Sequence, residues 1–177
     1  MICTRRATLI KLTRHTLQAA AILAAASLCA GMPSACADTA ADARQAIQFA
    51  HRKIDVALER KDFANVTAPC TPDFVSINDE GKRFTSAQVR SGLSHDLARA
   101  QSIQSTTIVQ TTTLTPGGAT VTLLQHLVVL TRYKVLVFGR LARTTLDQTR
   151  REEWIKANGT WRLKQSHTLS SDSHTNL

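Results

Sequence analysis

The sequence predicts an α+β domain in which helices come first and a strongly curved, mixed or antiparallel sheet follows. Residues 38–62 carry apolar side chains at helical spacing, whereas threonine, valine, isoleucine and leucine dominate from Ser102 onward, as in strands. A tight-turn signal, Asn158-Gly159, lies between the last two predicted strands. Because helices segregated in this way cover one face of a sheet, we expect a sheet wrapped around a long N-terminal helix, with a conical space between them.

The first 37 residues are predicted to be a signal peptide rather than part of this domain. They comprise a basic head, a short Ala-rich apolar run and Ala35-Cys36-Ala37, a small-x-small cleavage site. The apolar run is shorter than the roughly 20 residues that a spanning helix needs. Arg5-Arg6 resembles a twin-arginine signal, which leaves that route and the general secretory route open. We therefore expect residues 38–177 to be periplasmic or secreted by a bacterium, without membrane attachment after cleavage.

Composition argues against several classes of function. The chain has 22 Lys+Arg and 13 Asp+Glu, and four basic but no acidic residues lie in the first 37, so the mature net charge is +5. No basic run with interleaved aromatics occurs, so nucleic-acid binding is not expected. The sequence also lacks HxH, HExxH and CxxC patterns, GxSxG and a glycine-rich phosphate loop. We therefore expect no metal or other cofactor, and no hydrolase or nucleotide-binding function.

One cysteine, Cys70, remains in the predicted mature chain, so no internal disulfide is available and the core must hold the domain together. We expect Cys70 to be a small buried residue between Pro69 and Pro72. A reactive thiol and an intermolecular bridge are the alternatives.

The remaining elements follow from caps, turns and periodicity. Asp38 or Thr39 is the expected cap of the long helix, and Asp62 that of a short second helix. The segment "DFVSINDEGKRFT" predicts a hairpin. Thr85 and Gln88 form a capping-box pattern ahead of another helix. Four long strands follow, with a bend expected near Gly139, and the polar tail "SDSHTNL" is expected to fray.

The Asn158-Gly159 turn predicts the register of the last hairpin, with Ala157 opposite Thr160. Because side chains alternate between the faces of a strand, every second pair outward from the turn shares a face. These pairs are Lys156 with Trp161, Trp154 with Leu163, Glu152 with Gln165, and Arg150 with His167.

The tryptophan face must be the buried one, since it holds most of the apolar area of the hairpin. It would then also bury Arg150, Glu152, Gln165 and His167, and buried charges need partners. Two interpretations stay open. The four residues form either a polar patch that lines a ligand cavity, or a network whose members hydrogen-bond one another at the open, solvent-exposed end of the sheet. A shift of one residue in the turn would scatter the set.

Three segments in this order resemble the nuclear transport factor 2-like (NTF2-like) superfamily, in particular its SnoaL-like and DUF4440 groups. They are "ALERKDFANV", "TPDFVSINDEGK" and "EEWIKANGTWRLKQSH", and the resemblance covers residues 40–170. It implies a cone-shaped fold with a cavity and, frequently, a homodimer through the open face of the sheet. It does not imply one chemistry.

The same resemblance guides the predictions about function. Ketosteroid isomerases of this superfamily carry a base on the first strand, where this chain has Asn78, which cannot accept and return a proton. We therefore expect a module that binds a small, partly apolar ligand. Its predicted lining is Arg150, Gln165, Trp154, Trp161 and Asn78. The alternatives are a metal-free isomerase, cyclase or dehydratase with His167 and Glu152 as acid–base groups, and a dimeric protein-interaction module.

Overall fold

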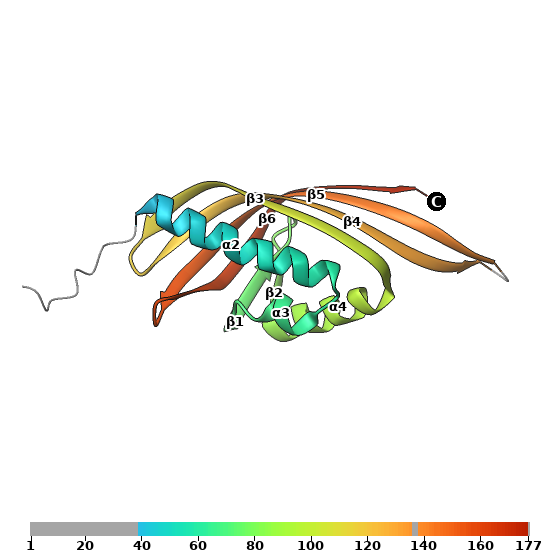
Figure 1. The fold of residues 1–177 in the computed structure, drawn as a ribbon, viewed down its shortest axis with the longest axis horizontal. Helices are drawn as coiled ribbons and strands as arrows, with labels where there is room; N and C mark the ends of the chain where they lie inside the picture. The colour runs from blue at the N-terminus through green and yellow to red at the C-terminus, as the bar shows by residue number, and fades with distance from the viewer. Residues whose placement is uncertain (1–38, 136–137, 177) are drawn as a thin grey trace, which may run out of the picture. The chain divides into compact units, whose positions relative to one another are not determined.

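A long helix lies along one face of a six-stranded sheet in the computed structural model, which describes residues 39–135 and 138–176 (Figure 1). The predicted signal peptide, residues 1–37, lies outside these residues. None of the helices in the described ranges is long and apolar enough to span a membrane. The elements are α2 (Ala40–Glu59), α3 (Phe63–Thr67), β1 (Cys70–Ile77), β2 (Arg83–Thr85), α4 (Ser86–Arg99), β3 (Ala100–Thr115), β4 (Gly118–Val135), β5 (Phe138–Ala157) and β6 (Thr160–Asn176).

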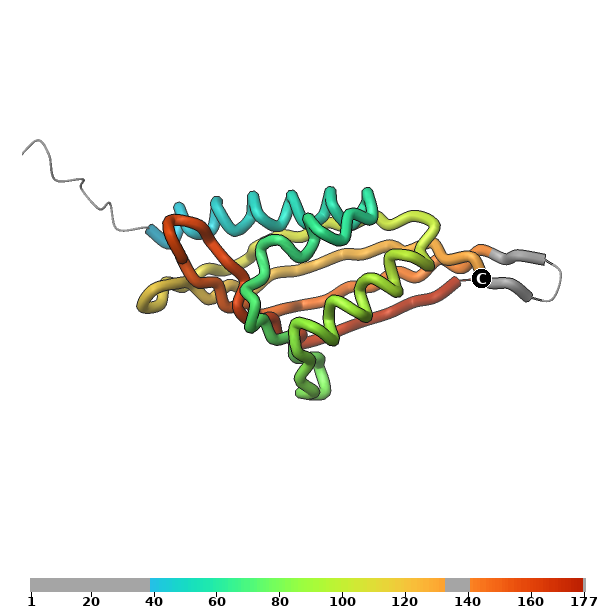
Figure 2. The backbone as a smooth tube through the Cα atoms, turned by 90° about the horizontal axis from the view of Figure 1, so that it is seen from below, coloured from blue at the N-terminus to red at the C-terminus, as the bar shows by residue number. Residues whose placement is uncertain are grey.

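The strand order is β2-β1-β6-β5-β4-β3, and the pairs are antiparallel except for the parallel pair β1–β6. The long strands bend over α2, and α2 and α4 lie on the same side of the sheet (Figures 1 and 2). The α+β prediction and its curved mixed sheet are confirmed. The prediction of a fraying tail is wrong, because β6 stays paired with β5 as far as Asn176 opposite Arg143. Gly139, where we expected a bend, lies in β5 opposite Lys134 of β4, and the two strands are paired as far as Val135 and Phe138.

The predicted caps are confirmed, and in each a side chain accepts a hydrogen bond from a backbone N–H group in the first turn of the helix. Thr39, rather than Asp38, accepts from the backbone of Asp42, whose carboxylate in turn accepts from the Thr39 N–H. Thr85 and Gln88 make the same reciprocal box at α4. Asp62 caps the single turn of α3. These bonds satisfy donors that a helix start otherwise leaves without partners.

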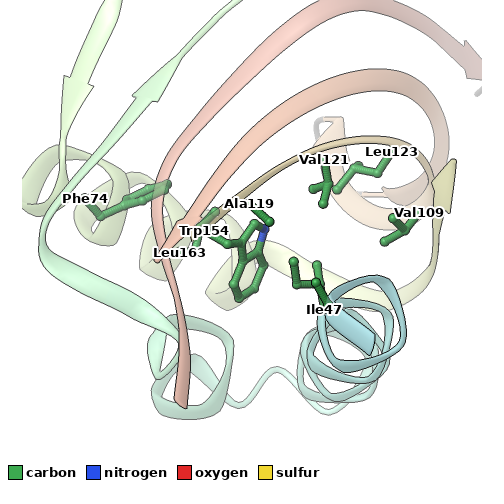
Figure 3. Packing of buried hydrophobic residues seen from close by; sticks show 9 residues of the cluster. Ile47, Phe74, Val109, Ala119, Val121, Leu123, Trp154 and Leu163 are labelled. Atoms are coloured by element: carbon green, nitrogen blue, oxygen red, sulfur yellow. The ribbon is translucent and has the colours of Figure 1, made fainter. Parts of the chain in front are cut away.

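The main core lies between α2 and the sheet, where β4 contributes Ala119, Val121 and Leu123 and each of β1, β3, β5 and β6 contributes one buried residue. Trp154 is 1% exposed and packs close to Ile47 of α2, as Figure 3 shows. Cys70, predicted to be buried, is half-buried and packs against the same cluster. A second cluster, under α3 and α4, closes the other end of α2. Its buried members are Leu58, Leu97, Ala100 and Ile103.

Polar side chains of α2 fasten the helix to β3, which is an edge strand of the sheet. Gln48 donates to the Thr107 carbonyl and accepts from the Val109 N–H, both at 2.8 Å. Asp55 accepts from the Thr107 N–H at 2.9 Å. These bonds occupy backbone groups that an edge strand would otherwise expose to another chain, and they fix the position of α2 along the sheet.

Candidate functional site

The hairpin turn is as the sequence predicts. Asn158 and Gly159 have φ of 50° and 74°, which suits a two-residue turn with left-handed central residues. The predicted pairs next to it are confirmed, with Lys156 opposite Trp161 and Trp154 opposite Leu163. Trp154 is buried and Trp161 packs against the same core cluster, so both indoles lie on the buried side.

Farther from the turn the predicted register is wrong, because β6 contains an irregularity between Leu163 and Gln165. One extra residue, Lys164, lies on β6 there, as in a β-bulge. Glu152 consequently pairs with Ser166 instead of Gln165, and Arg150 pairs with Thr168 instead of His167. The bulge thus divides the predicted polar set between the two faces of the sheet.

The centre of the buried side is Glu152, which is fully buried. Its Oε2 atom accepts two hydrogen bonds of 2.9 Å, from Nε2 of His51 and from Nε1 of Trp154. The His51 and Trp154 rings meet edge to face, with centroids 5.5 Å apart. The other oxygen, Oε1, lies 3.3 Å from Nη2 of Arg150 but has no hydrogen-bond partner among the described residues.

The charges around Glu152 favour its ionised form. Burial by itself raises the pKa of this carboxyl group, but the attraction and hydrogen bond of His51, the charge of Arg150 and the Trp154 hydrogen bond together hold the pKa below its ordinary value. A buried carboxylate is costly unless it is paired and hydrogen-bonded, and here both conditions are met.

Arg150 connects this buried cluster to the solvent-accessible part of the concave face, which is the side of the sheet that faces α2. Its Nε and Nη2 atoms donate to Ser166 Oγ at 3.0 and 2.6 Å, and Nη1 donates to Gln125 Oε1 at 2.9 Å. Its side chain remains 22% exposed, whereas that of Glu152 is 0% exposed. A guanidinium held at three of its nitrogens keeps a fixed direction, and a planar fork of this kind suits recognition of a carboxylate or carbonyl group.

The other predicted lining residues lie apart from this cluster. Gln165 and His167 pair with Glu153 and Arg151, so by alternation they lie on the opposite face from Ser166. Asn78 belongs to the β1–β2 turn, where its Oδ1 accepts from the Lys82 N–H at 2.8 Å. The structure therefore does not bring His167 and Glu152 together, and a catalytic role for either residue stays a prediction.

Sequence reasoning missed His51, Ser166 and Gln125. His51 had a usable signal, because the buried residues of α2 include Ala43, Ile47, His51 and Asp55, four residues apart. That spacing places them on one helix face. A histidine on an apolar stripe requires a polar partner on the surface that the helix covers. Glu152 is the buried carboxylate that meets this requirement.

The arrangement of this cluster suits the binding and orientation of a ligand, but the burial of its acid and base groups limits proton transfer to a ligand. Glu152 and His51 are 0% and 4% exposed, so neither presents an open face for proton transfer in this conformation. No group of three or more His, Cys, Asp or Glu side chains within residues 39–135 and 138–176 could hold a metal ion. Arg150, Gln125 and Ser166 are the polar groups of the cluster best placed to meet a ligand.

Among the surface grooves formed by the described residues, we consider three, and neither Glu152 nor Arg150 lines any of these. One, of about 460 Å³, lies mainly on the outer side of the sheet, beside Ile108, Leu124 and the exposed pair His126–Asp147. Another, of about 810 Å³, follows the outward side of α2. The third, of about 570 Å³, lies where α2 meets β3.

No protein-family model and no curated protein matches the sequence, whereas several solved structures share its architecture. The Kfla4162 protein from Kribbella flavida superposes with a TM-score of 0.64 at 13% identity, over 78% of this chain and 95% of that one. An NTF2-like superfamily protein from Salmonella enterica superposes with a TM-score of 0.55 at 14% identity, over 73% and 92% of the two chains. This chain has the NTF2-like fold.

A further NTF2-like structure, from Streptomyces avermitilis and named as a candidate dehydratase, superposes with a TM-score of 0.56 at 17% identity. The superposition covers 73% of this chain and 96% of that one. At this level of identity the similarity establishes the NTF2-like fold alone, since one fold supports many functions.

Proposed function

We propose that this domain binds a small, partly apolar ligand on the concave side of its sheet, and that Arg150 is the principal polar contact. The ligand would carry a carboxylate or another hydrogen-bond-accepting group for the guanidinium, and an apolar body for the neighbouring strand residues. Sites of this kind combine an apolar lining with a few well-placed polar groups.

The position of Arg150 carries this proposal. Its side chain is 22% exposed, yet its guanidinium is hydrogen-bonded to Ser166 and Gln125 and lies 3.3 Å from the carboxylate of Glu152. Beyond it, inward-facing residues of β4 and β5 are only half-buried: Gln125, Leu127, Leu146 and Gln148. A fixed cation at the border of such a half-open surface, which combines two leucines with two glutamines, is suited to hold the polar end of a ligand, because its direction is set before binding.

Native mass spectrometry of the protein produced by its own host tests the proposal. We expect an additional mass that is released on unfolding and that disappears in Arg150→Leu. Arg151→Leu is the matched control, because Arg151 is exposed on the opposite face of the same strand. Gln125→Ala provides a milder second variant, in which the Arg150–Glu152 pair is kept. A wild-type spectrum without bound mass, or equal retention in Arg150→Leu and Arg151→Leu, would contradict the proposal.

The same spectra test two further parts of the proposal. We infer that the protein is exported and processed, so the mature chain should begin at Asp38. We also infer that two copies associate through the outer face of the sheet, where Ile108 and Leu124 are 55% and 41% exposed. Exposed apolar side chains of neighbouring strands favour such contacts. An unprocessed N-terminus would refute export, and a monomer at all accessible concentrations would refute the dimer.

A further inference from the structure

A basic and apolar groove of about 810 Å³, which we name the α2 groove, follows the outward side of α2 and reaches α3 and the tip of the β5–β6 hairpin. Its apolar lining includes Phe49, Ile54, Val56 and Trp161. Phe49 and Val56 are 57% and 45% exposed. Ile54 and Trp161 also pack against the core clusters, whereas Phe49 and Val56 stay largely exposed, and exposed apolar groups gathered along a groove indicate an interaction site.

The rim of the α2 groove is positively charged. Arg52, Lys53, Arg60 and Arg162 line it, and all four are exposed. Asp62 is the one acidic side chain among the described residues that line it. Its carboxylate already accepts from the backbone and side chain of Asn65, at 3.2 and 2.6 Å. The groove therefore has an excess of positive charge that its own acidic residue does not neutralise.

The cations lie beside the apolar surface rather than away from it. Nζ of Lys53 is 4.5 Å from the centre of the Phe49 ring. Nη1 of Arg162 donates to the Ala68 carbonyl at 2.7 Å, which holds this side chain at the groove wall. Arg52 and Lys53 make no ion pair with any residue in the described part of the chain. An occupant with both apolar and acidic groups would complement each part of this surface.

The extent of the α2 groove distinguishes between possible occupants. The lining of α2 from Ala46 to Arg60 spans about 21 Å, and Arg52 and Arg60 are about 12 Å apart along the axis, at 1.5 Å per residue. One anionic head group cannot reach cations so far apart, whereas about six extended residues span such a groove at roughly 3.3 Å each. We propose that the α2 groove docks a short, extended segment of a partner protein that combines acidic and apolar residues.

Fluorescence anisotropy with a labelled peptide of alternating leucine and glutamate tests this proposal on the intact protein. We expect saturable binding that weakens with salt, and a dissociation constant raised about tenfold or more in Arg52→Glu/Lys53→Glu, because charge reversal removes the complementary rim. Phe49→Ser should also weaken binding, although it leaves every charge in place. Arg99→Glu is the control, since Arg99 is an exposed cation at the end of α4 and does not line the groove.

Each alternative gives a distinct result in this experiment. Equal binding of a leucine–lysine peptide, or an unchanged dissociation constant in Arg52→Glu/Lys53→Glu, would overturn the proposal. If dodecanoate or vesicles of anionic phospholipid bind through the same residues and the peptide does not, the occupant is an amphiphile or a membrane surface and the proposal is also wrong. Circular dichroism of each variant shows that the fold is retained. The ligand proposed for Arg150 lies on the other side of α2, so either proposal can fail alone.

Discussion

Two buried carboxylates, Glu152 and Asp55, lie on either side of the contact between α2 and the sheet, and they are satisfied in different ways. Glu152 is fully buried among charged or chargeable neighbours, with His51 at 2.9 Å and Arg150 at 3.3 Å. Asp55 is 8% exposed, and its three hydrogen bonds come from the Ser105 hydroxyl and from the N–H and hydroxyl of Thr107, at 2.6 to 2.9 Å.

The difference separates a charged cluster from a structural clamp. The partners of Asp55 are neutral groups of β3, so this carboxylate fastens a helix to an edge strand. The partners of Glu152 include a guanidinium that is itself partly exposed. A fully buried carboxylate beside such a cation is an expensive way to stabilise a fold, because an apolar residue of similar size often serves as well or better. The location of Glu152 therefore favours a role in orienting Arg150.

The largest expected effect of a single change at these two carboxylates comes from Glu152→Ala. Removal of the carboxylate leaves His51 and Trp154 without their buried acceptor and Arg150 without its opposite charge, and loss of one partner of a buried ion pair costs about 3–5 kcal/mol of unfolding free energy. Urea denaturation followed by the combined fluorescence of Trp154 and Trp161 measures this loss. Glu153→Gln, at the adjacent exposed position, is the control and should change the free energy by less than about 0.5 kcal/mol. A loss below about 1 kcal/mol in Glu152→Ala would show that the cluster is solvated rather than buried.

Asp55→Ala is expected to lower the free energy of unfolding by a smaller amount, about 1–3 kcal/mol. It leaves a buried N–H group of Thr107 and two hydroxyl groups without their acceptor, but it leaves no charged group without a partner. Asp55→Asn keeps one carbonyl acceptor and should lose less. The measurement is the same urea titration, with Glu59→Gln, an exposed residue of the same helix, as the control. If Asp55→Ala proves as costly as Glu152→Ala, the distinction between charged and neutral partners is wrong.

The sequence predicts the parts of the fold that depend on local chemistry. The caps at Thr39, Asp62 and Thr85 and the Asn158-Gly159 turn are each determined by a few neighbouring residues, and the structure has them where expected. The order of helices followed by strands is likewise sufficient for the α+β class. Residues near the turn keep the register that the turn imposes, which is why Trp154 and Trp161 are correctly assigned to one side.

The candidate site is less predictable because it depends on contacts between distant residues. The irregularity at Lys164 has no strong local signal, yet it changes every partner beyond it and separates His167 from Arg150. The hydrogen bond between His51 and Glu152 joins residues that are 101 positions apart in the sequence. The helical periodicity of the sequence therefore predicts that His51 lies on a buried face, but it does not identify the residue to which His51 bonds. The position of Asn78 in a turn depends on where β1 ends.

The smallest expected effect concerns Cys70, whose thiol pKa we expect to depend on the charge of Glu152 but not on that of Asp55. Burial, and then the negative charge of Glu152, raise the pKa of Cys70 to about 11, against opposing contributions from Arg90 and Arg150. Only roughly one thiol in a thousand is then ionised at pH 8, and the thiolate is the reactive form, so iodoacetamide should label folded protein far more slowly than unfolded protein. In Glu152→Gln the pKa should fall, and the labelling rate should rise at lower pH than in the wild type. Asp55→Asn should leave the pH profile of labelling unchanged, because Asp55 is not among the groups that shift this thiol. Identical profiles in the two variants would mean that burial alone controls Cys70 and that the charge of Glu152 is neutralised within its own cluster.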